Sequence, residues 1–267
     1  IKDYLNLEFS KYEALYGITP KETSRESVRL QVILDTAYQK TGKQVVVLID
    51  EYDSPLQHSW KTPEHKGCTE VYRSVFSVLK LKGNVLRFVF ITGITKFTQI
   101  SLFSVLNHLT NISFLPQFAP LCGITEEELT VNFAPELEAL ADKMECSIEE
   151  AHDKLKTYYD GYHFSDENMT DIYNPFSLLN ALSQLRLRNY WISSGATSML
   201  NKFVNNMELR LHDFEDCYID KDTLETSDVI EGGAELFLYQ TGYLTIKGFD
   251  EDGYSLGFPN EEVRKAL

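Results

Sequence analysis

The sequence predicts an α/β protein in which part of a parallel sheet is followed by a mainly helical region. Two short, strongly apolar segments have the composition of parallel strands, a segment with helical periodicity joins them, and helix-start signals follow from about residue 125. The chain has 267 residues, of which 43% are hydrophobic and 24% charged, as is usual for proteins that bury a large core. We therefore expect two domains, residues 1–124 and residues 125–267.

The first strand is expected at residues 45–49. Val45-Val46-Val47-Leu48-Ile49 is a run of five apolar residues, four of them β-branched, and it follows a helical pattern that ends near Gly42. Unbroken apolar runs are typical of parallel sheets, which helices cover on both sides. The sequence thus predicts a central strand that is buried on both faces and that ends before Pro55.

A second strand is expected at residues 85–91, after a helix over residues 69–82. The apolar residues of this helix recur at helical spacing, and Gly83 ends it. A strand, a helix and a strand that are joined by short links form a right-handed crossover. The two strands are therefore expected to lie parallel in one sheet.

The second domain carries three helix-start signals and one hairpin signal. Thr125–Glu128 and Ser147–Glu150 fit capping boxes, and Asn174-Pro175 fits an N-cap followed by proline at the first helical position. Residues 234–259 contain apolar segments on both sides of Gly242 and a turn at Asp250–Gly253, and this alternating pattern indicates a hairpin. A hairpin on a helical domain predicts a helical lid or a winged-helix-like region.

The charge of the chain disfavours a nucleic-acid partner. Lysine and arginine total 25 against 40 aspartate and glutamate residues, so the net charge is −15 and such a surface repels a phosphate backbone. Between Asp213 and Glu231, eight carboxylates stand against Lys221 alone, which indicates a solvated acidic loop. We expect the partner to be another protein.

Cysteine and histidine spacing predicts neither a disulfide framework nor a zinc site. The four cysteines are far apart, and no CxxC, HExxH or HxxxH spacing occurs. No apolar run is long enough to cross a bilayer, and no signal peptide is visible. The sequence therefore predicts a cytoplasmic protein without a membrane partner.

The strongest functional signal is the pair of carboxylates after the first strand. Asp50 and Glu51 follow residues 45–49 directly, and ligands of open α/β sheets bind beyond the carboxyl ends of the strands. Asp50 is expected to hold Mg²⁺, through water, because this cation keeps water ligands, and Glu51 to deprotonate the attacking water. This is the Walker B arrangement of P-loop ATPases. Surface acids without a function are the alternative.

Thr92, at the end of the second strand, is the expected sensor of such a site. If the two strands are neighbours, its hydroxyl lies beside the γ-phosphate and the attacking water. An ordinary threonine at a strand end is the alternative.

The phosphate-binding loop of these ATPases does not occur within the 267 residues. The pattern GxxxxGK[ST] is absent, and Gly42-Lys43 precedes the first strand where a P-loop would follow one. The chain opens with Ile1, so we expect either a fragment whose loop lies upstream or a gene that has lost the loop. ATP and Mg²⁺ are expected as cofactors only where that loop is supplied.

Residues 45–56, VVVLIDEYDSPL, resemble the Walker B block of a bacterial AAA-ATPase-like family, common in Bacteroidetes, whose members are usually called uncharacterised ATPases. Further blocks extend the resemblance over nearly the whole chain in the family's order: Tyr72–Lys80, Leu86–Phe97, Leu121–Leu129, Tyr159–Phe164, Tyr173–Ser177 and Gln240–Thr245.

This resemblance implies an ASCE-type P-loop core followed by a helical and winged-helix-like region. Asp50 and Glu51 match the family's Walker B acids, and Thr92 matches its sensor strand. In the family a Walker A loop lies upstream of the segment that matches residue 1, and a PD-(D/E)XK-nuclease-like domain often follows the segment that matches residue 267.

Three functions stay open on the sequence. The first is a Mg²⁺-dependent ATPase whose region 125–260 acts on a partner. The second is a non-catalytic, acidic protein-interaction module in which Asp50 and Glu51 are relics. The third and weakest is a nuclease, because its usual Asp…(Asp/Glu)-x-Lys core is not recognisable.

Two further features have open interpretations. Tyr158–Tyr162 is either a helix end with packed aromatics or a surface for a partner or a nucleotide base. AAA-type assemblies place an arginine finger at a subunit interface, so a homo-oligomer stays open. Candidates for the finger include Arg73, Arg87, Arg186 and Arg188.

Overall fold

The computed structural model describes the chain except residues 22–23, 96–107, 192–213, 216, 227–231 and 267. The chain divides into two compact units, Ile1–Thr110 and Asn111–Leu267. The sequence led us to expect the boundary between residues 124 and 125. In the structure, residues 111–124 are part of the second unit.

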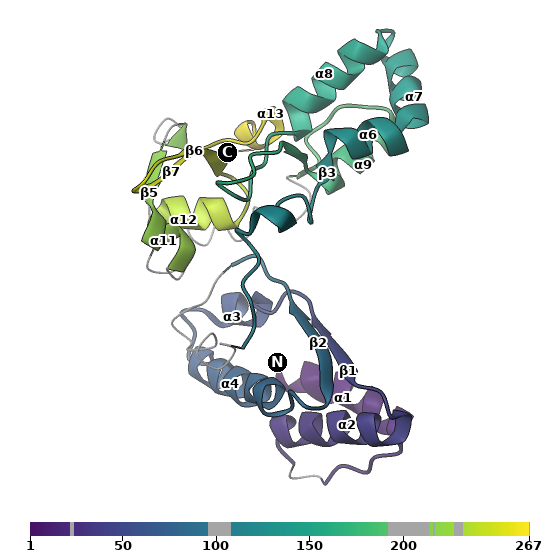
Figure 1. Ribbon diagram of the computed structural model, residues 1–267, viewed down its shortest axis with the longest axis vertical. Coiled ribbons are helices and arrows are strands. Elements are labelled where there is room, and N and C mark those ends of the chain that lie inside the picture. The colour runs from purple at the N-terminus through teal and green to yellow at the C-terminus, as the bar shows by residue number, and fades with distance from the viewer. Residues whose placement is uncertain (22–23, 96–107, 192–213, 216, 227–231, 267) are drawn as a thin grey trace. The chain divides into compact units, whose positions relative to one another are not determined.

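The first unit combines helices with two parallel strands (Figure 1). Its elements are α1 (Lys2–Tyr16), α2 (Glu26–Thr41), β1 (Val45–Ile49), α3 (Ser54–Ser59), α4 (His65–Leu81) and β2 (Leu86–Ile91). β1 and β2 pair in parallel, with Ile49 beside Ile91, as expected for a crossover through α4. The mixed α/β class that the sequence predicts is confirmed.

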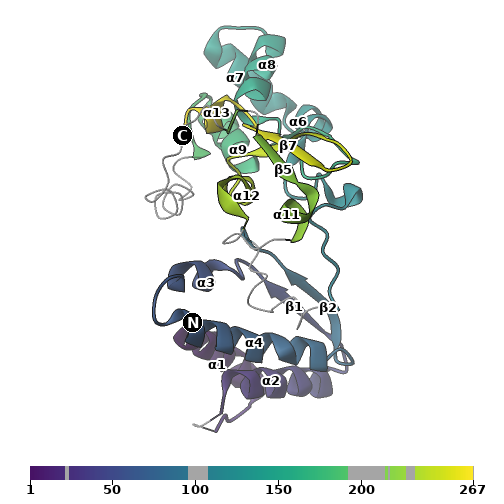
Figure 2. The same cartoon turned by 90° about the vertical axis from the view of Figure 1, so that its left-hand side faces the viewer.

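The two-stranded sheet of this unit is covered on one face. α2 packs on β1 and also contacts α1 and α4, and Figure 2 shows these three helices on the same side of the strands. On the other face, Val46 and Leu48 are 52% and 70% exposed, and Phe88 is 53% exposed. The expectation that β1 is buried on both faces is therefore wrong, because no described helix of this unit packs on that second face.

Left-handed glycines end the two helices that precede β1. Gly17 follows α1 with a φ of 61°, and Gly42 follows α2 with a φ of 66°. Residues with a side chain pay roughly 1–2 kcal/mol in this conformation, so glycine is favoured there. The stop predicted at Gly42 is confirmed, and the chain then turns directly into β1.

The second unit begins with a helical part. Its elements are η1 (Pro116–Phe118), β3 (Ile124–Thr125), α6 (Glu126–Asn132), α7 (Ala134–Met144), α8 (Ile148–Tyr159), β4 (Ile172–Tyr173) and α9 (Pro175–Gln184). Both predicted capping boxes are present, at Thr125 with Glu128 and at Ser147 with Glu150. Asn174 caps α9 through its side chain, as predicted.

A three-stranded antiparallel sheet with the order β5-β7-β6 forms the rest of this unit. Its elements are β5 (Cys217–Asp220), α11 (Lys221–Thr226), α12 (Gly233–Gln240), β6 (Thr245–Phe249), β7 (Gly253–Gly257) and α13 (Glu261–Arg264). The predicted hairpin is β6–β7, and its turn is closed by a hydrogen bond of 3.0 Å from Asp250 N to Gly253 O.

Part of the acidic segment 213–231 lies outside the described residues. Among the helices that the structure describes, none is long and apolar enough to cross a membrane.

Candidate functional site

Asp50 and Thr92 meet at the carboxyl edge of the parallel sheet. The Thr92 hydroxyl donates a short hydrogen bond to Oδ1 of Asp50. The backbone continues the strand pairing at this point, because Thr92 N donates to Ile49 O at 2.9 Å and Tyr52 N donates to Thr92 O at 3.0 Å. The structure thus brings together two of the three site residues predicted from the sequence.

Glu51, the third predicted site residue, has a left-handed backbone with a φ of 50°. Its amide donates to Oδ1 of Asp50 at 3.0 Å, and the side chains of both acids are exposed to solvent. A non-glycine residue in this conformation costs of order 1–3 kcal/mol, and such strain clusters at functional sites. The turn leaves both carboxylates and the Thr92 hydroxyl accessible from one edge of the sheet.

The oxygen atoms at this edge fit the metal side of a magnesium–nucleotide site. Mg²⁺ is usually bound through one or two carboxylates together with water and substrate phosphates, which suits Asp50. In the part of the chain that the structure describes, no group of three His, Cys, Asp or Glu side chains could hold a metal by itself. The residues present therefore fit the metal only together with phosphate oxygens that a substrate supplies.

Asp53 is a functional candidate that the sequence reasoning did not single out. Its side chain is only 1% exposed, and it accepts hydrogen bonds from the loop that follows β2. Ile94 N donates at 3.2 Å to one carboxylate oxygen, and Thr95 donates to the other from its amide at 2.6 Å and from its hydroxyl at 2.7 Å. The amide of Gln57 supplies a fourth donor. The sequence feature that could have indicated Asp53 is its position within the block of residues 45–56, three positions after Asp50.

Aromatic packing closes the same region around Gly93. The Tyr52 hydroxyl donates to Thr95 O at 3.0 Å, and the Tyr72 hydroxyl donates to Tyr52 O at 2.5 Å. Burial raises the pKa of Tyr72, so its hydroxyl stays a donor at any physiological pH. A Cβ atom on Gly93 would lie 2.5 Å from both Oδ1 of Asp53 and Cδ1 of Tyr52. Only glycine fits this approach of the two loops.

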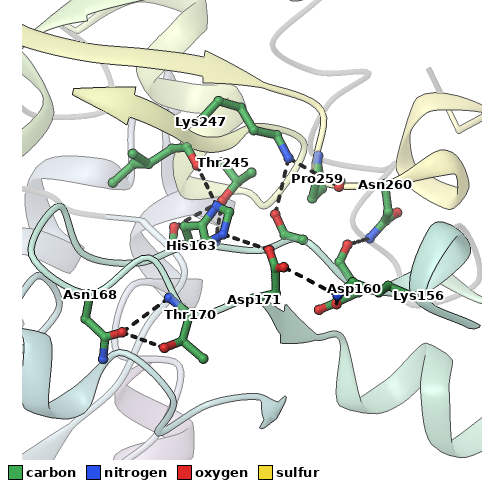
Figure 3. A network of polar contacts seen from close by, with 12 residues as sticks. Lys156, Asp160, His163, Asn168, Thr170, Asp171, Thr245, Lys247, Pro259 and Asn260 are labelled. Carbon is green, nitrogen blue, oxygen red and sulfur yellow. Dashed lines mark hydrogen bonds and ion pairs between the residues drawn. The ribbon is translucent and has the colours of Figure 1, made fainter. Parts of the chain in front are cut away.

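A second polar cluster lies in the second unit, where the segment after α8 meets β6 (Figure 3). The amide of His163 donates to Oγ1 of Thr245 at 2.7 Å, and that hydroxyl donates back to His163 O at 3.0 Å. The His163 ring contacts Ile246 O through Nδ1 at 2.8 Å and Asp171 Oδ1 through Nε2 at 2.9 Å. These bonds join the helical part of the unit to the antiparallel sheet.

Asp160 lies at the edge of this cluster with a buried, poorly compensated carboxylate. The residue is 2% exposed, and neither carboxylate oxygen has a hydrogen-bond partner. Nζ of Lys156 lies 4.0 Å from Oδ2 of Asp160. The side chain of Asn260 donates to the backbone carbonyl of Asp160, at 3.1 Å, and not to its carboxylate. Burial raises the pKa of Asp160 to about 6, because removal from water disfavours the charged form.

The aromatic residues beside Asp160 are largely structural. Tyr159 and Tyr162 are buried, and the Tyr159 hydroxyl donates to Arg188 O at 2.9 Å. The sequence left a helix end and a binding surface open for Tyr158–Tyr162, and this burial favours the helix end. The four arginine-finger candidates are all exposed, so exposure does not choose among them.

Residues 1–103 match the model of a family described as a predicted AAA-ATPase. The matched segment contains Asp50, Glu51, Asp53 and Thr92. A curated protein of Azotobacter chroococcum mcd 1, described as an uncharacterized protein in the vnfD 5' region, is 32% identical over 251 residues. The alignment covers 92% of this chain and 46% of that protein, so the chain spans about half the length of this relative. No solved structure matches the chain.

Proposed function

We propose that the chain is part of a Mg²⁺-dependent ATPase whose hydrolysis acts on a protein partner. The single observation that carries this proposal is the hydrogen bond between Thr92 and Asp50 at the carboxyl edge of a parallel sheet. An acid and a polar hydroxyl at the ends of neighbouring strands are the arrangement that nucleotide hydrolysis uses. The match of residues 1–103 to predicted AAA-ATPases supports the same function.

Each of the three residues has a distinct role in this proposal. Asp50 would hold the metal that accompanies the substrate, and the Thr92 hydroxyl would act as the sensor of the γ-phosphate. Glu51 accepts the proton of the attacking water, for which its exposed carboxylate is free to turn toward the phosphate end. When bound, Mg²⁺ would neutralise charge that develops on the phosphate oxygens. The cradle for the phosphates would come from residues outside this sequence.

The exposed face of the first sheet supports a P-loop-type core with further elements. Val46, Leu48 and Phe88 share that face, since Val46 lies beside Phe88 and Leu48 beside Phe90 in the strand register. Parallel sheets are normally covered on both sides. In the proposed intact ATPase, other parts of the protein pack on this face.

The arrangement of the second sheet supports a winged-helix-like region. Its order β5-β7-β6, with α11 and α12 between β5 and β6, gives a strand, two helices and a closing hairpin. α12 contains no lysine or arginine, and Asp250, Glu251 and Asp252 occupy the tip of the hairpin. A helix without cations beside an acidic hairpin tip suits a protein partner better than a nucleic acid.

A non-catalytic interaction module is the second candidate function. The observation that favours it is the solvent exposure of Asp50 and Glu51 in a sequence without the pattern GxxxxGK[ST]. In this case the chain binds a partner and the acids are relics of an ancestral site.

ATP turnover by the full-length gene product tests the first function. We expect hydrolysis in Mg²⁺, and at least a hundredfold lower kcat in Glu51→Gln. Equal kcat in the parent and in this variant contradicts the role of Glu51. Asp35→Asn, which removes a half-buried ion pair with Lys82 from the same unit, is the control that leaves turnover unchanged. A rise in the melting temperature of the full-length gene product with Mg·ATP would separate the ATPase from the interaction module.

A further inference from the structure

Asp53 joins the two loops that carry the proposed catalytic groups. It lies in the turn that begins with Asp50 and Glu51, whereas Ile94 and Thr95 lie in the loop that begins at Thr92. Three hydrogen bonds of 2.6–3.2 Å run from Ile94 and Thr95 to the Asp53 carboxylate. Among the described residues, no other side chain accepts as many hydrogen bonds from this part of the second loop.

The geometry of these bonds requires a carboxylate. Two backbone amides, one hydroxyl and the Gln57 amide all donate, so an acceptor with two oxygen atoms and no proton satisfies them together. Bonds to a charged acceptor are about twice as strong as neutral ones. The 1% exposure of Asp53 excludes the water that would otherwise compete.

The packing around Asp53 makes the connection between the loops stiff. A Cβ atom on Gly93 would collide with the Tyr52 ring and the Asp53 carboxylate, so the backbone passes close to both, and the Tyr52 hydroxyl donates to Thr95 O. The strand register and the Asp53 bonds therefore fix both ends of the segment from Thr92 to Thr95. A small shift of that segment would separate the Thr92 hydroxyl from Asp50.

From these contacts we propose that Asp53 is a positioning residue that holds the loop of Thr92 in register with Asp50 and Glu51. It touches neither substrate nor metal and acts through the loop after β2. The role rests on the proposed ATPase function, but the positioning itself is a property of the folded chain and can be measured without ATP.

The test uses Asp53→Asn, which keeps the shape of the side chain but turns an NH₂ group toward donors. In the 267-residue chain, amide hydrogen exchange followed by NMR is expected to be at least tenfold faster at Ile94 and Thr95 than in the parent. Asp35→Asn is the matched control and leaves both rates unchanged. Parent-like exchange at both amides in Asp53→Asn overturns the positioning.

Turnover by the full-length gene product gives the second measurement. We expect Asp53→Asn to lower kcat at least tenfold and to leave the KM for Mg·ATP within a factor of two, while the control Asp35→Asn retains the parent kcat. Faster exchange with unchanged kcat shows that Asp53 is merely structural and overturns the catalytic half of the inference. If the parent itself hydrolyses no ATP, the proposed function fails, and the exchange rates still decide whether Asp53 holds the loop.

Discussion

Asp53 in the first unit and Asp160 in the second are almost equally buried, at 1% and 2% exposure, but the surroundings of their carboxylates are opposite in hydrogen bonding. Asp53 accepts hydrogen bonds from four donors, whereas neither carboxylate oxygen of Asp160 has a partner. The first carboxylate thus exchanges water for protein donors. The second loses water, and the described cation nearest to it is a lysine nitrogen 4.0 Å away.

The difference shows that burial alone does not tell what a carboxylate does in a fold. A buried charge is tolerated when donors replace its hydration, and otherwise it favours the neutral form. Asp53 can therefore stabilise its surroundings as an anion. Asp160 is best accommodated when it carries a proton, which makes the second unit sensitive to pH.

Asp53→Ala is expected to have the largest effect. It leaves several buried donors without an acceptor, so the free energy of unfolding of the first unit should fall by about 3–4 kcal/mol. Urea unfolding followed by Trp60 fluorescence in a Trp191→Phe background measures this unit. A loss below about 1 kcal/mol would mean that water reaches the donors, and the contrast with Asp160 would then disappear.

Asp160→Asn is expected to stabilise the second unit at pH 8. The folded-state pKa of Asp160 is raised to about 6, so its contribution is complete at acid pH and is lost as the pH rises through that value. At pH 8 the variant should gain roughly 2 kcal/mol, less than the full pKa shift implies because solvent screens part of the effect, and near pH 3, below the ordinary aspartate pKa, the gain should vanish. Unfolding followed by Trp191 fluorescence in a Trp60→Phe background tests the pH dependence, with the exposed Asp142→Asn on α7 as control. An equal gain at both pH values would point to packing instead of charge.

Gly93→Ala should destabilise the first unit by about 1–3 kcal/mol, because the new Cβ enters the space of Asp53 and Tyr52. Gly83→Ala is the matched control, since a Cβ there meets nothing within 4 Å. Thermal unfolding of the two variants under the same conditions gives the comparison. Equal melting temperatures would show that the loops around Asp53 can separate without cost.

Ser147→Ala is expected to have the smallest effect, about 1 kcal/mol, because it removes the capping box at the start of α8. Unlike Asp160→Asn, it should act equally at pH 5 and pH 8. Urea unfolding of the second unit at both pH values checks this. A loss that depended on pH would mean that α8 and Asp160 are coupled, and the pH dependence could no longer be assigned to one carboxylate.

Local signals predicted much of the secondary structure. The residues that stop and cap helices act within a few positions, so Gly42, Thr125 and Ser147 could be read directly from the sequence. The β6–β7 hairpin was visible for the same reason. Parallel pairing of β1 and β2 followed from the handedness of crossovers, and it placed Asp50 beside Thr92.

The features that could not be predicted from the sequence depend on contacts between residues that are far apart in the chain. Three of the four donors to Asp53, on Ile94 and Thr95, lie about forty positions further along the chain, and no local pattern indicates that they converge on it. The apolar run of β1 predicted two buried faces because composition reports what a strand can bury and not which elements are there to cover it. The burial of Asp160 could not be predicted either, since Asn260, the N-cap of α13 that bonds its carbonyl, lies 100 positions further along the chain.

The open face of the first sheet has a practical consequence for the chain in isolation. Val46, Leu48 and Phe88 form an exposed apolar patch on this sheet, and the outer edges of its two strands have no described partner. Exposed apolar patches and unpaired strand edges both favour self-association. The net charge of −15 opposes this by mutual repulsion, and salt weakens that repulsion. Concentrated samples should therefore stay dispersed in dilute buffer and cluster reversibly as the ionic strength rises.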